Sequence, residues 1–542
     1  MNIFKKVLII ILAMAFIVAT LAGCTGKSNN GSTTSENTAS DSTSKDSTSD
    51  SSDSTNSSSD DTGKVDTSKE VHLIYYLWGN EGPANQDILN EINKKLKADI
   101  NATIEVKYID WPDVATKYPL LFASGEQFDM AHGSTNAVVS YFTLAAQGSL
   151  TDITDMVDKV APKLKAEIPE ESWKSAEYKG RIYGVPTAYT EFTPYGYVYR
   201  RDLKEKYGLG EINSIETMEA YMDAVVKNEN FPALNGNSND AQNMYRMFVD
   251  LTGDWIEAPG IPVSEMHLVA VSPEKYDEII HPAFTQEFED WAVLMHEWAS
   301  KGYWPKDILS AQQDAKTNFN NGNSGGFITH MPDWTGNYGT VKKNLPDVET
   351  DFWCFAENTG KIKKKLGVEN ITIISANSKN PERALMAIEK FMTDEEYYRL
   401  IQYGIEGRQY EIVDGIARKP EKFNPDVDAG GFAAWALRND KFNVPYDTED
   451  PRRYELIKEW SKIAINNPYV GFSFDSTNIS SELAAIANVN SQLGVQIMLG
   501  KTPDPKKAVE QYRNQLKQAG IEKVIEEVKK QLKDFTPIDL GN

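Results

Sequence analysis

The chain has 542 residues and a formal net charge of -23 at pH 7. This acidic balance argues against nucleic acid or an anionic membrane surface as a partner, because like charges repel. Cys24 and Cys354 are the two cysteines. Cys24 lies in a segment whose pattern predicts cleavage of a signal peptide, so Cys354 is the one cysteine of the folded part. We therefore expect no intramolecular disulfide there.

The first residues predict a signal peptide over 1–23. Lys5 and Lys6 give it a positive start, and the apolar run 7–21 is too short for a comfortable membrane span. The run ends in Leu21-Ala22-Gly23-Cys24, which resembles the bacterial lipobox. This resemblance implies cleavage before Cys24 and lipidation, including palmitate, on its sulfur. The alternative is an ordinary signal peptide that ends near a cysteine.

Residues 24–68 form a tract dominated by Ser, Thr, Asn and Asp. Such a segment cannot bury enough apolar surface to offset its conformational entropy, so we expect a disordered tether. A flexible coil of this length has an end-to-end distance of roughly 35 to 40 Å. With a lipid anchor at Cys24, the folded body would lie at the extracytoplasmic face of the cell membrane. A disordered regulatory tail is the alternative.

Strands and helices alternate after the tract. The β-branched and aromatic runs predict strands, and Pro112 marks the start of one helix. This order predicts a parallel sheet covered by helices, with ligands beyond the carboxyl ends of its strands. The predicted elements are a strand at 71–77, a helix at 88–100, a strand at 102–109, a helix from 112 to about 124, and a strand at 128–132.

Several later segments resemble, in the same order, parts of the family 1 extracellular solute-binding proteins. The region from about Gly404 onward resembles the C-terminal part of LipO-type lipoproteins in this family. The other segments are YKGRIYGVPTAYT (178–190), GYVYRRDLKEKYGL (196–209), SIETMEAYMDAVVK (214–227), FNNGNSGGFITHMPDW (319–334) and NPERALMAIEKFMTDEEYYRL (380–400).

The resemblance implies an α/β fold of the periplasmic-binding-protein type: two lobes, each a sheet flanked by helices, with a hinge between them. It also implies capture of a solute, in many members a sugar, and delivery to the permease subunits of an ABC importer. We expect a monomer without catalytic residues, metal or cofactor. The alternatives are a binder of peptide or another solute, and a surface glycoside hydrolase.

The length of the chain after the tether also favours two lobes, since about 475 residues follow Lys69. We place lobe one at 69–188 plus 367–404, and lobe two at 189–366 plus 405–542. The amphipathic C-terminal segment 503–535 is expected to pack on one of the lobes.

Aromatic side chains at element ends and in loops are the candidates for sugar contact, because sugar C–H faces pack on aromatic rings. Trp291, Trp298 and Trp460 fall inside predicted helices and are assigned to packing. Asp129 has a second interpretation as a helix cap or turn residue, and Arg408 as half of a surface ion pair. The predicted ligand-binding residues are Trp78, Asn80, Trp111, Asp129, Tyr189, Asp333, Trp334, Glu406, Arg408 and Trp435.

Patterns that would indicate an enzyme or a metal site are weak. The sequence GNSGG (322–326) resembles the nucleophile turn of trypsin-like proteases, but no fitting His and Asp segments accompany it, so we interpret it as a glycine turn. The six histidines are scattered, and their spacing does not predict a metal site. A glycosidase needs two carboxylates about 5 to 10 Å apart, and nothing in the sequence marks such a pair.

Overall fold

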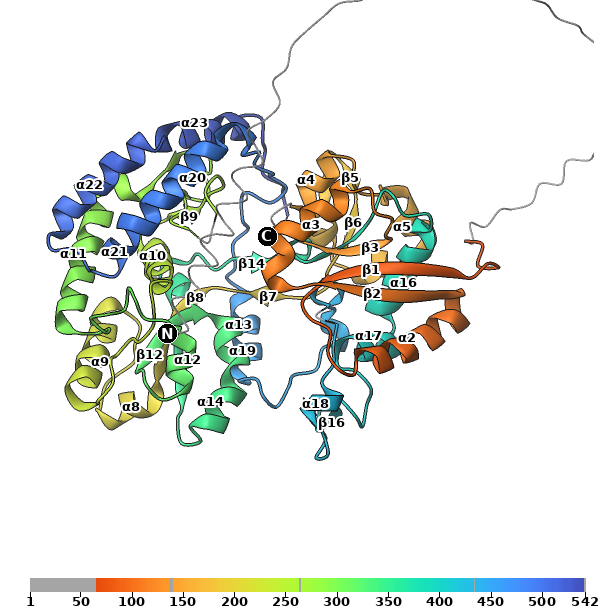
Figure 1. The fold of residues 1–542 in the computed structure, drawn as a ribbon, viewed down its shortest axis with the longest axis horizontal. Helices are drawn as coiled ribbons and strands as arrows, with labels where there is room; N and C mark the ends of the chain where they lie inside the picture. Colours follow the sequence, from red (N-terminus) through yellow and green to blue (C-terminus); the bar gives the residue numbers. More distant parts are fainter. Residues whose placement is uncertain (1–64, 136–139, 263–264, 433, 541–542) are drawn as a thin grey trace, which may run out of the picture. The chain divides into compact units, whose positions relative to one another are not determined.

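The computed structural model describes residues 65–135, 140–262, 265–432 and 434–540 (Figure 1). The predicted signal peptide, Cys24 and the tract 25–64 lie outside the described residues. Within the described ranges, no helix combines the length and the apolar composition that a membrane span requires. The last residues of the predicted tether are bound to the body, because Arg383 donates a hydrogen bond to the backbone oxygen of Asp66 and Asn101 donates one to that of Thr67.

The longest strands are β1 and β2, with eight residues each, and most of the others are short. They are β1 Val71–Trp78, β2 Ala102–Ile109, β3 Met130–Gly133, β4 Glu177–Tyr178, β5 Arg181–Ile182, β6 Gly184–Pro186, β7 Glu191–Phe192, β8 Tyr195–Arg200, β9 Ile256–Glu257, β10 Val269–Ala270, β11 Ile279–Ile280, β12 Gly326–His330, β13 Thr350–Cys354, β14 Lys364–Lys365, β15 Ile371–Ile374, β16 Glu411–Val413 and β17 Ile416–Arg418.

Helices connect most of these strands and make up most of the C-terminal part. They are α2 Asn85–Ile100, α3 Val114–Ala123, α4 Tyr141–Ala146, α5 Thr154–Val160, α6 Pro162–Glu167, α7 Glu170–Ser175, α8 Arg201–Lys206, α9 Ile215–Asn228, α10 Asp240–Leu251, α11 Gln286–Lys301, α12 Ala315–Asn320, α13 Met331–Gly336, α14 Tyr338–Asn344, α15 Phe355–Thr359, α16 Pro381–Thr393, α17 Glu395–Gln402, α18 Pro425–Asp428, α19 Arg452–Trp460, α20 Ser480–Val489, α21 Val495–Met498, α22 Pro505–Gln518 and α23 Ile521–Leu532.

Short helical turns complete the chain. They are η2 Trp111–Asp113, η3 Pro282–Phe284, η4 Gly367–Glu369, η5 Trp435–Leu437, η6 Asp440–Phe442, η7 Thr477–Ile479 and η8 Asn490–Gly494.

The first sheet has five strands in the order β2-β1-β3-β15-β6. Strand β1 pairs in parallel with β2 and β3, as the alternation of strands and helices predicts. Strand β15 then pairs antiparallel with both β3 and β6. The carboxyl ends of β1, β2 and β3 therefore meet at one edge of this sheet.

Helices cover both faces of the five-stranded sheet (Figure 1). Successive residues of β1 point to opposite faces, as in any strand. Leu73, Tyr75 and Leu77 pack in the core with helices α2, α16 and α17. Ile74, Tyr76 and Trp78 pack in a second core that includes side chains of α3 and α4. The sheet is thus the middle of three layers.

A second sheet has three strands in the antiparallel order β12-β8-β13. Its central strand again alternates between two cores. Tyr197 and Tyr199 pack with helices α9, α10 and α11, whereas Val198 packs with Trp334 and Trp460 on the opposite face. The predicted α/β fold, with sheets flanked by helices, is confirmed.

Strands β7 and β14 pair with each other outside both sheets. In the sequence, β7 follows β6 of the five-stranded sheet and precedes β8 of the three-stranded sheet. Likewise, β14 follows β13 of the three-stranded sheet and precedes β15 of the five-stranded sheet. The chain therefore passes from one sheet to the other along these two paired strands. We call β7 and β14 the crossing strands.

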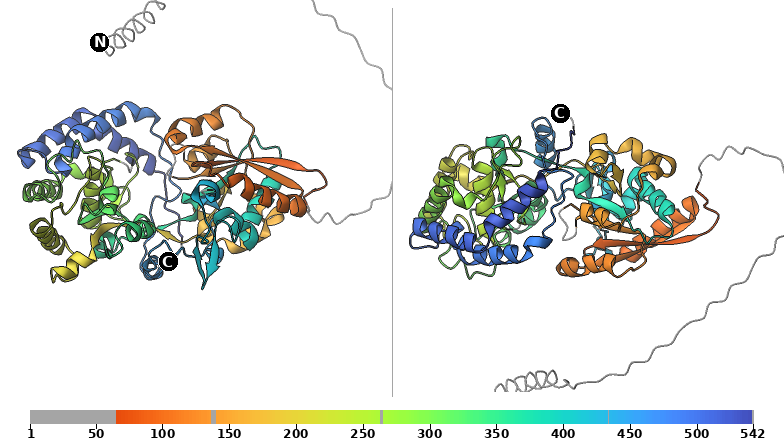
Figure 2. Two further views of the ribbon diagram at one scale, coloured as in Figure 1. Left: turned by 60° about the horizontal axis from the view of Figure 1, so that its bottom comes forward. Right: turned by 90° about the horizontal axis from the view of Figure 1, so that it is seen from above.

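Helices α21 and α22 pack against α11, and α20 and α23 pack against α22 and each other, in the blue and green part of Figure 2. Val509, Tyr512 and Leu516 of α22 and Val524 and Val528 of α23 are buried in the core with α9, α10 and α11. The predicted packing of the amphipathic segment 503–535 is confirmed.

One segment is placed differently from the expected division of the chain. Phe432, Ala434 and Leu437 are buried in the core of the five-stranded sheet, although the division assigns 405–542 to lobe two. The reason is apolar burial: this loop covers the end of the sheet beside β15 and α16. The exact lobe boundaries stay a prediction.

Candidate functional site

Four rings gather at the carboxyl edge of the five-stranded sheet. Trp78 ends β1, Trp111 follows β2, and His132 lies in β3. The rings of Trp78 and His132 are 4.4 Å apart between centroids, and those of Trp78 and Trp111 are 6.3 Å apart. Trp435, from η5, adds the fourth ring, 5.4 Å from that of Trp111 and 6.2 Å from that of His132. We call these four residues the aromatic cluster.

The aromatic cluster presents apolar ring surface to solvent through one member in particular. Trp111 is 51% exposed, whereas Trp78 is 9% exposed. Trp435 is half-buried. An exposed indole beside other rings is a stacking surface for a flat apolar face, such as the C–H face of a sugar. Three of the predicted ligand-binding residues therefore lie together.

Polar groups surround the rings. Asn80 is exposed just beyond β1 and donates a hydrogen bond to Asp110 at 2.8 Å. The Trp78 Nε1 and His132 Nδ1 atoms are buried without a hydrogen-bond partner within the part of the chain that the structure describes. Burial, and then the charge of Arg438, lowers the pKa of His132 to about 3. The imidazole is therefore neutral at ordinary pH.

Tyr189 lies next to this edge, where the chain leaves the five-stranded sheet towards β7. Its ring lies 4.1 Å from the guanidinium carbon of Arg438, and its hydroxyl accepts a hydrogen bond from Arg453 at 3.1 Å. Arg438 also donates to Glu191 of β7 at 3.1 Å. The ion pair of Arg438 and Glu191 thus joins this edge of the sheet to the crossing strand β7.

A second aromatic and charged group lies on the three-stranded sheet. Tyr195 begins β8 and His330 ends β12, with ring centroids 5.7 Å apart. The guanidinium carbon of Arg246 lies 4.5 Å from the centroid of the Tyr195 ring. Burial lowers the pKa of His330, although Asp333 opposes this effect. Sequence reasoning did not select these residues.

Asp129 has a structural role in this arrangement. It is 3% exposed, its Oδ2 accepts a hydrogen bond from the Ile74 backbone at 2.9 Å, and its Oδ1 accepts one from Ser378 at 2.6 Å. These bonds tie β1 to the loop after β15. Asp129 thus has a structural role immediately before β3, and its contact with a ligand stays a prediction.

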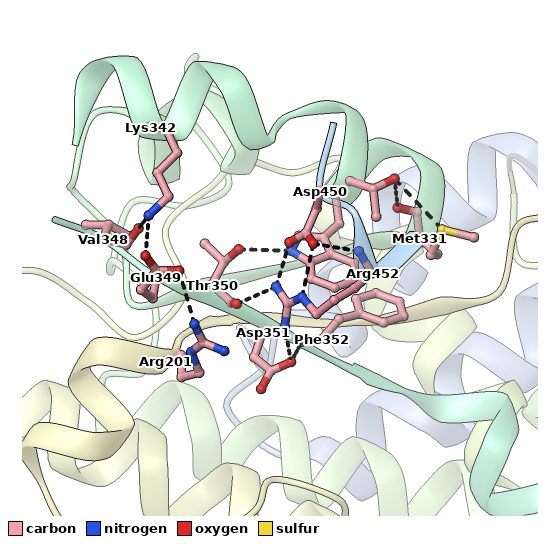
Figure 3. Close-up of polar contacts among 12 residues, drawn as sticks. Arg201, Met331, Lys342, Val348, Glu349, Thr350, Asp351, Phe352, Asp450 and Arg452 are labelled. Atoms are coloured by element: carbon pink, nitrogen blue, oxygen red, sulfur yellow. Dashed lines mark hydrogen bonds and ion pairs between the residues drawn. The ribbon is translucent and has the colours of Figure 1, made fainter. Parts of the chain in front are cut away.

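Trp334 is buried rather than placed beside the aromatic cluster. It is 4% exposed, lies parallel to Phe352 with ring centroids 5.0 Å apart, and donates from Nε1 to Thr350 at 3.1 Å. The guanidinium of Arg452 covers its other side, 4.7 Å from the ring. Figure 3 shows Arg452 held by Asp351 and Asp450 and by the backbone oxygen of Thr350. Trp334 therefore packs between Phe352 and Arg452.

Asp333 of α13 is engaged in local bonds. It accepts hydrogen bonds from Lys316 and Thr329, each at 2.8 Å. The backbone N–H of Asp333 also donates to His330. Asp333 is thus linked to the group on the three-stranded sheet rather than to the aromatic cluster.

Glu406 and Arg408 lie on the loop after α17. Glu406 is exposed. Arg408 donates to Asp87 at 2.7 Å and to Asp428 at 2.8 Å. This is the ion pair of the second interpretation of Arg408, and it joins the start of α2 to the segment that leads to Trp435. Whether any of the ten predicted residues contacts a ligand stays a prediction.

Sequence reasoning missed His132 and Arg438 as parts of this edge. His132 could have been selected, because it lies at the end of a predicted strand. Arg438 carried no such signal, since its partner Glu191 is far away in the sequence and the loop between them had no predictable path.

The serine of GNSGG is a buried structural residue. Ser324 is fully buried, and its hydroxyl donates to the Gly326 carbonyl at 2.7 Å. Gly322 has a φ of +74°, which favours glycine. This geometry is that of a glycine turn.

In open α/β sheets, ligands bind beyond the carboxyl ends of the strands, and the aromatic cluster lies at this edge of the five-stranded sheet. The chain belongs to the family of bacterial extracellular solute-binding proteins, which it matches over residues 91–405. Residues 468–537 match a domain of unknown function (DUF3502), so the more specific likeness to LipO-type lipoproteins stays a prediction.

Individual relatives agree with this family. A carbohydrate ABC transporter substrate-binding protein of Streptococcus pneumoniae serotype 4 (strain ATCC BAA-334 / TIGR4) is 24% identical over 470 residues, covering 85% of this chain and 90% of that protein. The structure of the N-glycan transport solute binding protein (NgtS) from Streptococcus pneumoniae superposes with a TM-score of 0.69 at 22% identity, covering 86% of this chain and 99% of that chain.

A solute-binding protein from Bifidobacterium longum infantis ATCC 15697, described as HMO binding and ABC-transporter associated, has a TM-score of 0.60 at 16% identity. The match covers 87% of this chain and 100% of that chain. These structural likenesses show that the chain has the fold of solute-binding proteins.

Proposed function

We propose that the protein captures a carbohydrate, an oligosaccharide in particular, and delivers it to the permease of an ABC importer. The observation that carries this proposal is the aromatic cluster, whose exposed Trp111 ring lies beside Trp435 at the carboxyl edge of the sheet. Family membership supports solute capture. The names of the relatives, which refer to carbohydrate and N-glycan transport, support a sugar.

The chemistry of the edge suits a neutral, hydroxyl-rich solute. Indole rings pack on the C–H faces of a sugar, and amide and carboxylate groups such as Asn80 and Asp110 can exchange hydrogen bonds with its hydroxyls. Arg438 is already paired with Glu191, so its charge is balanced before a ligand arrives. A site for the carboxylate of a peptide would instead present an uncompensated cation.

The proposal includes binding without turnover. The family consists of binding proteins, and Asp129 and Asp333, the two carboxylates among the predicted residues that lie near the sheets, are occupied by structural hydrogen bonds. Incubation of the protein with a bound oligosaccharide should leave the sugar chemically unchanged. Released reducing ends in proportion to protein concentration would contradict this part of the proposal.

We also propose that the mature protein begins at Cys24 and is held at the extracytoplasmic face of the membrane by lipid on that residue. The support is the likeness of Leu21-Ala22-Gly23-Cys24 to a lipobox. A tether would let the loaded protein reach its permease within a small volume, which raises the effective concentration. Cys24→Ser should release or misprocess the protein. Retention of this variant in carbonate-washed membranes would contradict the proposal.

A thermal-shift screen tests the ligand class. A solute that binds only the folded state stabilises it by about 2.7 kcal/mol at a hundredfold excess over Kd, so the unfolding temperature should rise with at least one oligosaccharide and not with peptides of similar size. Trp111→Ala and Trp435→Ala should each weaken binding tenfold or more, and Phe284→Ala, which removes an exposed ring elsewhere, should not. A shift with peptides and none with a wide oligosaccharide panel would overturn the sugar assignment.

A further inference from the structure

One side chain, that of Arg438, joins the aromatic cluster to a crossing strand. Its Nε donates a hydrogen bond to the backbone oxygen of Trp435 at 3.2 Å. Its Nη2 donates to the Glu191 carboxylate of β7 at 3.1 Å. A single planar guanidinium therefore fixes the turn that carries Trp435 relative to the strand along which the chain passes between the two sheets.

The pair of Arg438 and Glu191 is shielded from water. Each of the two side chains is 14% exposed, so the pair is screened less than one on the open surface. Burial alone would raise the pKa of Glu191, but Arg438, followed by Lys365, brings this pKa below its usual value. Glu191 is therefore charged at neutral pH and remains a partner for Arg438.

The same guanidinium reaches a third element through Tyr189. The Tyr189 ring lies 4.1 Å from the guanidinium carbon of Arg438, and its hydroxyl accepts a hydrogen bond from Arg453 of α19. Helix α19 packs against α13, which follows the three-stranded sheet. The contacts of Arg438 thus extend from the edge of the five-stranded sheet to a helix that packs with the other sheet.

We infer that Arg438 is a positioning residue that fixes Trp435 relative to β7, so that a solute stacked on the aromatic cluster is coupled to the crossing strands. A lysine could not replace it, because an ammonium group lacks the planar fork that serves two acceptors and stacks on a ring. The ligand-coupling part of the inference rests on the proposed function. The positioning part concerns the protein alone.

Fluorine NMR of protein labelled with 5-fluorotryptophan tests the positioning directly. Trp435→Phe assigns the Trp435 resonance by its loss. Arg438→Met and Glu191→Gln should each shift or broaden this resonance and leave that of the buried Trp460 unchanged. Arg200→Met is the matched control, because Arg200 is also 14% exposed and is paired with Asp202. The control should leave the Trp435 resonance in place.

Affinity then tests the coupling. With an oligosaccharide that binds the unaltered protein, Arg438→Met should raise Kd tenfold or more, and Arg438→Lys should restore only part of the loss. Glu191→Gln should add little to Arg438→Met, since both remove the same contact.

An unmoved Trp435 resonance in both variants, or affinity losses that simply add, would overturn the inference. If Arg438→Met does not fold, Glu191→Gln, which is nearly isosteric, decides the outcome by the same resonance. If no oligosaccharide binds the unaltered protein, the proposed function fails, and the resonance alone still decides whether Arg438 positions Trp435.

Discussion

At the scale of single residues, Trp111 and Trp334 have opposite surroundings. Trp111 is 51% exposed, whereas Trp334 is 4% exposed and packs between Phe352 and Arg452. Trp334→Ala should therefore lower the free energy of unfolding by about 3 to 5 kcal/mol. Trp111→Ala should lower it by less than Trp334→Ala does, because about half of the Trp111 surface is already exposed to water in the folded state. Urea unfolding of both variants measures the difference, and equal losses would contradict these placements.

Buried histidines should make folding stability depend on pH. Burial lowers the pKa of His132 and of His281 to about 3, and that of His267 to about 4. An unfolded histidine titrates at about 6.5, so the unfolded state binds more protons than the folded state below that pH. The stabilisation is present above about pH 6.5 and is lost progressively as the pH falls towards these folded-state values.

Urea unfolding at about pH 7 and about pH 5 checks this dependence, with an expected loss of about 1 to 2 kcal/mol for each buried histidine. His281→Gln should reduce the loss. His72→Gln should not, because the His72 side chain is 57% exposed. A stability that rises on acidification would contradict the assignment of neutral buried imidazoles.

The sequence could predict that Trp78 and Trp111 lie at one edge of the sheet, but not which distant side chains contact them. Trp78 and Trp111 follow predicted parallel strands, so their proximity follows from sheet geometry. Trp435 was selected only because it lies in a loop, and its approach to Trp111 depends on the apolar burial of the neighbouring Phe432 and Leu437. The burial of Trp334 depends on Thr350, Phe352 and Arg452, whose convergence no local pattern indicates.

At the scale of elements, the first three strands were predictable because alternation and helical spacing are local signals. Strand β1 spans Val71–Trp78 and β2 spans Ala102–Ile109, close to the predicted 71–77 and 102–109. The antiparallel strand β15 pairs with β3 and β6 from a distant part of the sequence. Such non-local pairing has no signature in a single sequence.

Gly500 allows the turn after α21 to lie against α11. It has a φ of +60°, and a Cβ atom added there would lie 2.0 Å from the Met295 backbone oxygen. Gly500→Ala should therefore destabilise the fold by more than about 2 kcal/mol, because backbone strain and a clash act together. Urea unfolding measures this loss.

Gly302→Ala is the matched control for Gly500→Ala. Gly302 has a φ of +78°, but an added Cβ would meet nothing within 4 Å. Only the conformational cost, about 1 kcal/mol, should remain. Equal losses for the two variants would show that the contact with α11 does not constrain Gly500.

At the scale of the whole molecule, the C-terminal residues contact two separate cores. Phe535 packs against Phe472 and the core that contains α22 and α23. Leu540, together with Ile538 and Val470, packs in the core that contains α3 and α4. Val470 of the segment that matches a domain of unknown function, together with the residues that follow this segment, therefore joins the helical region to the core beside the five-stranded sheet.

Truncation after Phe535 should expose part of the core that contains α4. Loss of the buried Leu540 and the half-buried Ile538 should cost about 2 to 4 kcal/mol of folding stability. Hydrogen exchange of the α4 amides should accelerate, since local opening becomes easier. Val427→Ala, at a position that is 52% exposed, is the control and should change neither quantity. Unchanged exchange in α4 after truncation would contradict the packing of the tail.

Capture of a sugar on the aromatic cluster is tested most directly by a crystal structure of the protein with the oligosaccharide that raises its unfolding temperature most. We expect a sugar ring in van der Waals contact with Trp111 or Trp435, at about 3.5 to 4.0 Å between carbon atoms, and hydroxyls within hydrogen-bond distance of polar groups at the same edge. A sugar bound elsewhere, with no atom in contact with either indole, would contradict the proposed site.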